Sequence, residues 1–211
     1  MDERKTHFAR EGALIKHTSI KQKRLYVDEI VRTRGASAIP LLVEMLAQDS
    51  WTLREASAAA LAAMGPQVLH SVLPLARSGL WFARAAATRV LGAVGGSESV
   101  PVMLRMLSEE NSTVTSAAAD ALTRICQRGG AASVSRRLFE LESAARDAAL
   151  VQIEARDLDS GARVRQLLLD RQLMTVREDE DEVWEEPAAA AGGSSGHGLV
   201  WEVLTGGKAQ S

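Results

Sequence analysis

An internal repeat of about thirty residues is the feature that most constrains the fold of this chain. The stretch WTLREASAAALAAMG at residues 51–65 recurs thirty residues later as WFARAAATRVLGAVG at residues 81–95. Each copy begins with Trp, carries Arg at its fourth position, continues through an alanine-rich run and closes on Gly. A weaker third copy lies a further 31 residues on, with Leu122 in the place of Leu91. A period of this length indicates supersecondary units that stack on one another.

Each copy contains two apolar segments that have the spacing of α-helices. The first segment is typified by AIPLLVEMLA at residues 38–47, and the second by LREASAAALAAM at residues 53–64. In the second segment apolar side chains recur at intervals of three and four residues, which places them on one helix face. Alanine lets this helix lie close to its neighbours, and Gly65 and Gly95 supply helix ends that tolerate left-handed backbone. The unit is therefore predicted to be a helical hairpin, with about three hairpins over residues 36–130.

The composition agrees with an all-α chain. Aromatic residues make up only 4% of the 211 residues, and the abundant Ala, Leu, Arg and Glu favour helices over strands. The net charge of -2 leaves no basic excess for a phosphate backbone, which argues against nucleic acid as the partner. The single Cys126 excludes an internal disulfide, and no apolar run reaches the roughly 18 residues of a membrane span. We expect no transmembrane segment and a cytoplasmic location.

The residues before the repeats are predicted to cap the first hairpin. Residues 1–35 are rich in Lys and Arg and are predicted to hold a helix over 19–33. This helix is predicted to start at a capping box formed by Ser19 and Gln22 and to stop at Gly35.

The residues after the repeats are predicted to cap the other end. Residues 131–177 are assigned to C-terminal helices, because residues 131–160 contain neither Pro nor Gly and favour one long helix or a helical pair. The DSG stretch at 159–161 is predicted to break this helix. The near-heptad spacing within 131–160 also raises the hypothesis that the chain forms a homo-oligomer there. Residues 178–211 are acidic and then rich in small residues, so a flexible acidic tail with a short apolar motif is predicted.

The two clear copies, WTLREASAAALAAMG and WFARAAATRVLGAVG, resemble HEAT repeats, in particular the short HEAT-like class first noticed in phycobilisome lyases. The resemblance extends over residues from about 36 to 128 and implies a short α-solenoid. The family pattern places an acidic turn before the Trp, which Asp49 satisfies in the first copy but Ser78 and Gly79 do not in the second. The third copy carries Thr115 where the family has Arg, which indicates that the stack is ending.

The repeated Trp and Arg residues are the first candidates for a binding site. In a solenoid the second helices line one face, so Trp51 with Trp81 and Arg54 with Arg84 are predicted to form two rows. Because Trp and Arg dominate interface hot spots, these rows predict a groove for an apolar or acidic peptide. The resemblance implies an alternative, in which the same residues pack and bond across the turns of the solenoid.

The predicted tail offers a second candidate. The strings EVWEE at 182–186 and LVWEVL at 199–204 share Val-Trp-Glu, so Val183, Trp184, Val200 and Trp201 are further candidate binding residues. An aromatic side chain in a charged, flexible stretch has no core to join and is typical of segments that order on binding. Docking onto the repeats of the same chain is the alternative.

The sequence shows no arrangement of catalytic or metal-ligating residues. The four histidines are scattered, and no glycine pair is followed by the Lys-Ser or Lys-Thr of a phosphate loop. We therefore expect a non-catalytic protein-protein interaction scaffold or adaptor, with no cofactor and no metal, whose partner is another protein. The alternative, implied by the resemblance, is a bilin lyase-like or nucleic-acid-acting enzyme built on the same repeats.

Overall fold

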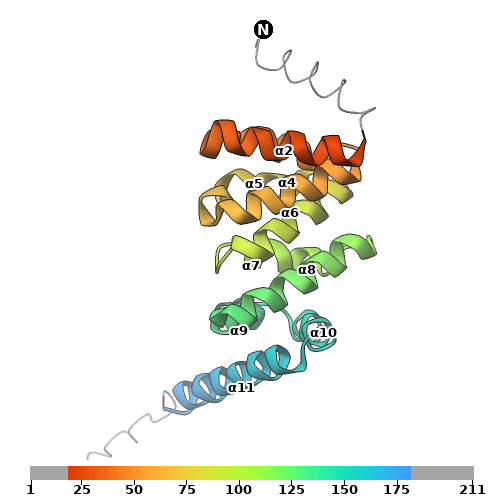
Figure 1. Ribbon diagram of the computed structural model, residues 1–211. Helices are drawn as coiled ribbons and strands as arrows, with labels where there is room; N and C mark the ends of the chain where they lie inside the picture. The colour runs from red at the N-terminus through yellow and green to blue at the C-terminus, as the bar shows by residue number, and fades with distance from the viewer. Residues whose placement is uncertain (1–18, 182–211) are drawn as a thin grey trace, which may run out of the picture. The chain divides into compact units, whose positions relative to one another are not determined.

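The computed structural model describes residues 19–181, with side chains described for residues 19–173. The chain divides into two units, Met1–Leu173 and Met174–Ser211, and the features below belong to the first. Every regular element in the described span is helical, which confirms the all-α prediction (Figure 1). The α-helices are α2 (Ile20–Arg34), α3 (Ile39–Leu46), α4 (Trp51–Met64), α5 (Leu69–Ser78), α6 (Trp81–Val94), α7 (Val100–Met106), α8 (Ser112–Ile125), α9 (Ala131–Phe139), α10 (Ser143–Glu154) and α11 (Leu158–Asp181).

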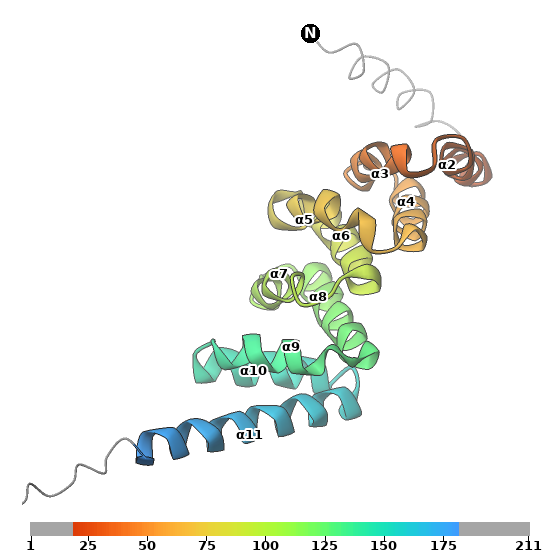
Figure 2. The ribbon, with the colours of Figure 1, turned by 90° about the vertical axis from the view of Figure 1, so that its left-hand side faces the viewer.

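Helices α3 to α10 pair into successive hairpins that stack as a short α-solenoid. Figure 2 shows α3, α5 and α7 on one side of the stack and α4, α6 and α8 on the other. The second helices form a continuous row, because α4 packs against α6, α6 against α8 and α8 against α10. Helices α9 and α10 form a fourth hairpin, so the hairpins do not end at residue 130 as predicted but continue to Glu154.

The core of the stack is built from one equivalent position in each second helix. Leu61, Leu91, Leu122 and Ile153 are each 0% exposed and lie 30, 31 and 31 residues apart. Full burial of a side chain of this size contributes about 1.5–3 kcal/mol, so four such positions form a substantial part of the core. The apolar period seen in the sequence is therefore the period at which the hairpins stack.

The N-terminal cap agrees with its prediction. Helix α2 begins after Ser19, whose side chain accepts from the Gln22 backbone N–H while the Gln22 side chain accepts from the Ser19 backbone N–H. It ends at Gly35, which has a φ of 52° that strongly favours glycine. Helix α2 buries Val27 and Ile30 and packs against α4, so it covers the exposed flank of the first hairpin.

The C-terminal cap differs from its prediction. Residues 131–160 form a helical pair followed by the start of α11, and DSG at 159–161 lies inside the first turn of α11 rather than breaking a helix. The break lies earlier, at residues 155–157, because the carboxylate of Asp157 accepts from the Ser160 backbone N–H at 3.2 Å and caps the new helix. Helix α11 then buries Val164 and Leu168. Self-association through 131–160 stays a prediction.

Asp157 gives the C-terminal cap a predicted pH dependence. Hydrogen bonds from the Ser160 hydroxyl and the Gln127 amide hold the pKa of this carboxyl below its usual value. A depressed pKa means that the stabilisation is present above the unfolded pKa, about 3.9, and is lost as the pH falls through the lower folded value. Replacing Asp157 with Ala is therefore expected to lower the Tm at neutral pH, by a margin that shrinks as the pH falls through the folded pKa of this carboxyl. Circular dichroism melts at neutral pH and at a series of falling acid pH values, with the exposed Asp147→Ala as control, measure this change; an Asp157→Ala deficit that stays the same over the whole series contradicts it.

Candidate functional site

The arginines predicted to bind a ligand close the turns that lead into the second helices. Arg54 Nη1 donates to the carbonyl oxygens of Gln48 at 2.7 Å and Asp49 at 2.9 Å. Arg84 Nη1 donates to the carbonyl oxygen of Gly79 at 2.9 Å. In both hairpins the guanidinium therefore satisfies backbone acceptors of the turn between the first and second helix, where the chain leaves helical geometry.

The same contact recurs in the third and fourth hairpins with different residues. The Thr115 hydroxyl lies 3.0 Å from the carbonyl oxygen of Glu109, so a smaller donor replaces the missing Arg. In the fourth hairpin Arg146 donates to the carbonyl oxygens of Phe139 at 3.1 Å and Leu141 at 2.9 Å. Sequence analysis missed Arg146, although it lies 31 residues after Thr115 and is the fourth residue of its helix.

Other arginine contacts link one hairpin to the next. The Arg54 guanidinium lies 4.7 Å from the centroid of the Phe82 ring, and Arg84 forms an ion pair with Glu109. Arg128 donates to the carbonyl oxygens of Gly92 at 2.7 Å and Gly95 at 3.0 Å, which caps the C-terminal end of α6. Arg54 and Arg84 thus have partners inside the chain, and a role in binding a ligand stays a prediction for both.

The two repeated tryptophans are exposed at the surface. Trp51 and Trp81 are the first residues of α4 and α6 and are 59% and 47% exposed. The Arg54 to Phe82 contact shows that the N-terminal ends of these two helices lie side by side. Trp81 also packs edge-on against Phe82, with ring centroids 5.6 Å apart. The structure therefore presents two large apolar side chains at the same end of adjacent helices.

A groove of about 810 Å³ runs between α2 and α4 and includes one of these tryptophans. Its α4 wall carries Trp51, Glu55, four alanines and Met64, and its α2 wall carries charges of both signs. The lining residues are Arg24, Asp28, Val31, Arg32, Trp51, Glu55, Ala56, Ala59, Ala60, Ala63 and Met64. The groove is therefore apolar along its length and close to neutral at its rim.

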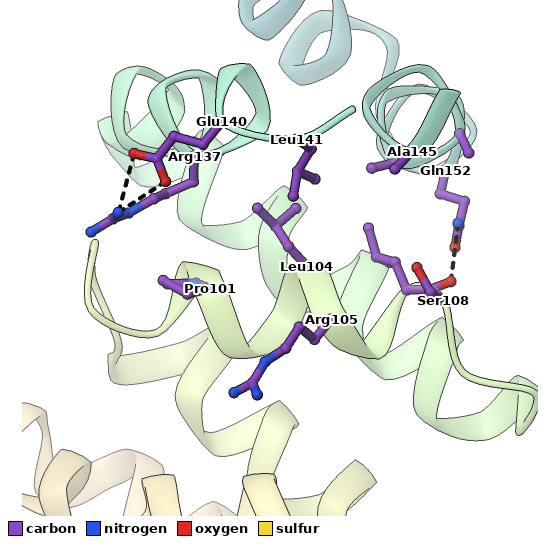
Figure 3. A pocket seen from close by; sticks show the side chains of 12 residues that line it. Pro101, Leu104, Arg105, Ser108, Arg137, Glu140, Leu141, Ala145 and Gln152 are labelled. Atoms are coloured by element: carbon purple, nitrogen blue, oxygen red, sulfur yellow. Dashed lines mark hydrogen bonds and ion pairs between the residues drawn. The ribbon is translucent and has the colours of Figure 1, made fainter. Parts of the chain in front are cut away.

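A second pocket, of about 490 Å³, lies between α7, α9 and α10 (Figure 3). No residue of this pocket was predicted as a binding residue. Its lining residues are Pro101, Leu104, Arg105, Leu107, Ser108, Arg137, Glu140, Leu141, Ala145, Ala148, Ala149 and Gln152. The sequence does not predict this pocket. The alanines of α10 match the pattern of buried alanines in the other second helices, so they do not indicate an open surface.

The remaining candidates offer little chemistry. Cys126 is buried, and burial raises the pKa of its thiol to about 11, so it stays protonated at neutral pH. Among the residues that the structure describes, no group of three or more His, Cys, Asp or Glu side chains is placed to hold a metal ion.

No single helix in the described part of the chain has the length and apolar character to cross a membrane. Helix α4 and the following segment up to Ser78 together reach that length and apolar character, but the two are bent by 119° relative to each other. Val183, Trp184, Val200 and Trp201 lie outside the described residues.

Comparison with known proteins agrees with this architecture. Residues 71–156 match the family model of HEAT repeats, from within α5 to just beyond the end of α10. The match includes the fourth hairpin, which supports the extension of the repeats past residue 130. A search of curated proteins finds none that matches the chain. The stacked hairpins, the recurring turn contact at the fourth residue of each second helix and the family match together show that residues 71–156 form HEAT repeats.

Proposed function

We propose that this chain is a non-catalytic adaptor that binds another protein through the N-terminal part of its second-helix row, centred on Trp51 and Trp81. HEAT repeats are generally protein-interaction scaffolds and are typically non-catalytic. The observation that carries the proposal is the pair of exposed indoles at adjacent helix starts, one of them inside the α2–α4 groove. The described residues hold no observation that favours the bilin lyase-like or nucleic-acid-acting alternative.

The arrangement of the two tryptophans favours binding for a physical reason. Covering an exposed indole removes a large apolar area from water and supplies the kind of anchor that dominates interface energetics. The turn contact of Arg54 and its position over Phe82 hold the starts of α4 and α6 in place, so little ordering cost accompanies association. The alanines of the α2–α4 groove leave room for an apolar side chain of the partner beside Trp51.

Affinity capture with full-length chain tests this proposal. Wild type, Trp51→Ala, Trp81→Ala and the matched control Val151→Ala, whose side chain is 59% exposed on α10, are compared by quantitative mass spectrometry of the retained proteins. The Kd of the purified partner is then measured for each variant. We expect each Trp variant to weaken binding by about tenfold or more, as loss of an interface anchor does, and the control to leave it unchanged.

Two results would count against this binding face. If a partner is retained equally by wild type, both Trp variants and Val151→Ala, the contact lies elsewhere on the chain. If the partner is lost only when the chain is cut after Met174, the Val-Trp-Glu strings at 182–186 and 199–204 are the binding element instead.

A further inference from the structure

The fourth hairpin leaves apolar surface uncovered that the earlier hairpins bury. Ala145 and Ala148 occupy the third and sixth positions of α10, and both are exposed. At the corresponding positions of α6, Ala83 and Ala86 are each 0% exposed, and the equivalent residues of α8 are also buried. In α6 and α8 this helix face is buried within the stack. In α10 the same face is open and lines the pocket between α7, α9 and α10.

The pocket has an apolar centre between two polar ends. Figure 3 shows Leu104 and Leu141 facing each other across the middle, with Ala145 beside them. Gln152 and Ser108 lie at one side, where the Gln152 amide donates to the carbonyl oxygen of Leu107 at 3.4 Å. A volume of about 490 Å³ falls within the roughly 300–1,000 Å³ of small-molecule sites, and an apolar lining with a few polar groups is their usual character.

The lining of the pocket carries surplus positive charge. Arg137 is paired with Glu140, with Nη1 between 3.0 and 3.2 Å from its two carboxylate oxygens. Arg105 forms no hydrogen bond or ion pair with any residue of the described part of the chain. Two guanidinium groups against one carboxylate leave a net charge of one positive unit on the lining, which favours a ligand with a single negative charge.

We propose that this pocket binds an apolar monocarboxylic acid, with its hydrocarbon body against Leu104, Leu141 and Ala148 and its carboxylate at the rim towards Arg105, the arginine that Glu140 does not neutralise. Burial of the hydrocarbon body supplies the affinity, because it covers apolar surface that the stack leaves exposed. The carboxylate supplies the selectivity, because it neutralises the surplus charge of the rim. The pocket lies on α7, α9 and α10 and shares no lining residue with the α2–α4 groove, so this inference is independent of the proposed protein-binding face.

Calorimetric titration of the full-length chain with decanoate tests the proposal. Ala148→Leu fills the pocket and is expected to weaken decanoate binding by about tenfold or more. The matched control Ala144→Leu makes the same change at an exposed alanine of α10 that lines neither pocket and is expected to leave decanoate binding unchanged. Decyltrimethylammonium, which has the same hydrocarbon length and the opposite charge, is expected to bind about tenfold more weakly than decanoate, and Arg105→Gln is expected to reduce that preference.

The position of the binding site and its preference for an acid are tested by different results. Absence of decanoate binding, or equal binding by wild type and Ala148→Leu, overturns the pocket as the site. Equal binding of decanoate and decyltrimethylammonium overturns the preference for an acid. If Ala148→Leu melts at a markedly lower temperature than wild type, Ala145→Leu replaces it, because Ala145 lines the same pocket and is also exposed.

Discussion

Replacing Gly92 with Leu is expected to destabilise the folded chain by about 3 kcal/mol or more, the upper end of what overpacking costs. Gly92 is a buried residue of α6 at the point where α6 approaches α8 most closely. A Cβ placed there would lie 2.7 Å from the Cβ and 2.8 Å from the Cα of Ala121. Because one of these atoms belongs to the α8 backbone, a side chain at residue 92 forces the two helices apart.

The smaller substitution Gly92→Ala tests the same close contact, because its effects on helix propensity and on packing have opposite signs. Alanine raises helix propensity by about 1 kcal/mol over glycine, so an exposed site would gain stability from the change. At residue 92 the clash is expected to outweigh that gain and leave a net loss of about 1–2 kcal/mol, measured as the free energy of unfolding in urea. Gly96→Ala, which lies just beyond the end of α6, is the control for the same change without a clash, since a Cβ there meets no atom within 4 Å. A stabilised Gly92→Ala variant would show that α6 and α8 are not close enough at this point for a Cβ at residue 92 to clash with Ala121.

The close packing of the second helices is the part of the fold that the sequence predicted best. Alanine recurs at the same positions of successive second helices, which predicted that these helices lie close together, and the equivalent residues Ala87 and Ala118 are indeed fully buried. Gly92 was not singled out, because its counterparts one repeat away are Ala62 and Thr123 and so it belongs to no repeating pattern. A contact that occurs once in the stack depends on the local separation of two helices, and a repeat pattern does not encode that separation.

The repeat pattern also failed to predict how the fourth hairpin packs. Its second helix begins with Ser143 rather than Trp, so the most visible mark of a repeat is missing although Arg146 and Ile153 keep the register. The alanines at 145 and 148 match the pattern of buried positions, yet they line an open pocket. Composition at these positions predicts a small side chain but does not fix how far α9 lies from α10, so the pocket was beyond prediction from sequence.

The sequence predicted the positions of the candidate binding residues but not their surroundings. The pairing of Trp51 with Trp81 and of Arg54 with Arg84 followed directly from the thirty-residue period, and the structure places each pair on adjacent helices. The thirty-residue period did not predict that the arginines have partners within the chain while the tryptophans are exposed, because both residue types recur at the same interval. The guanidinium reaches back to the turn carbonyls, whereas the indole at the first helical position has no turn to fold against and stays exposed.

Replacing Arg84 with Ala is expected to lower the free energy of unfolding by about 2 kcal/mol, within the range for hydrogen bonds that involve a charged group. Arg84 combines a bond to the Gly79 carbonyl within its own hairpin with an ion pair to Glu109 of the next hairpin. Its side chain is only 23% exposed, so water compensates poorly for the lost contacts. Arg84 Nε is buried without an acceptor among the described residues, which limits the net gain and keeps the expected loss below 3 kcal/mol.

A double-mutant cycle separates the two contacts of Arg84. Glu109→Gln removes the charge of the partner, and the coupling between the two variants is expected to be about 1 kcal/mol, with the rest of the Arg84→Ala loss assigned to the turn contact. Arg89→Ala is the control, because Arg89 pairs with Glu55 at 2.5 Å but is 43% exposed, and an exposed pair contributes about 1 kcal/mol at most. Equal losses for Arg84→Ala and Arg89→Ala would mean that the turn contact adds nothing. A larger loss for Arg84→Ala than for Arg89→Ala means that the recurring arginine stabilises the turn of its own hairpin in addition to pairing with the next hairpin.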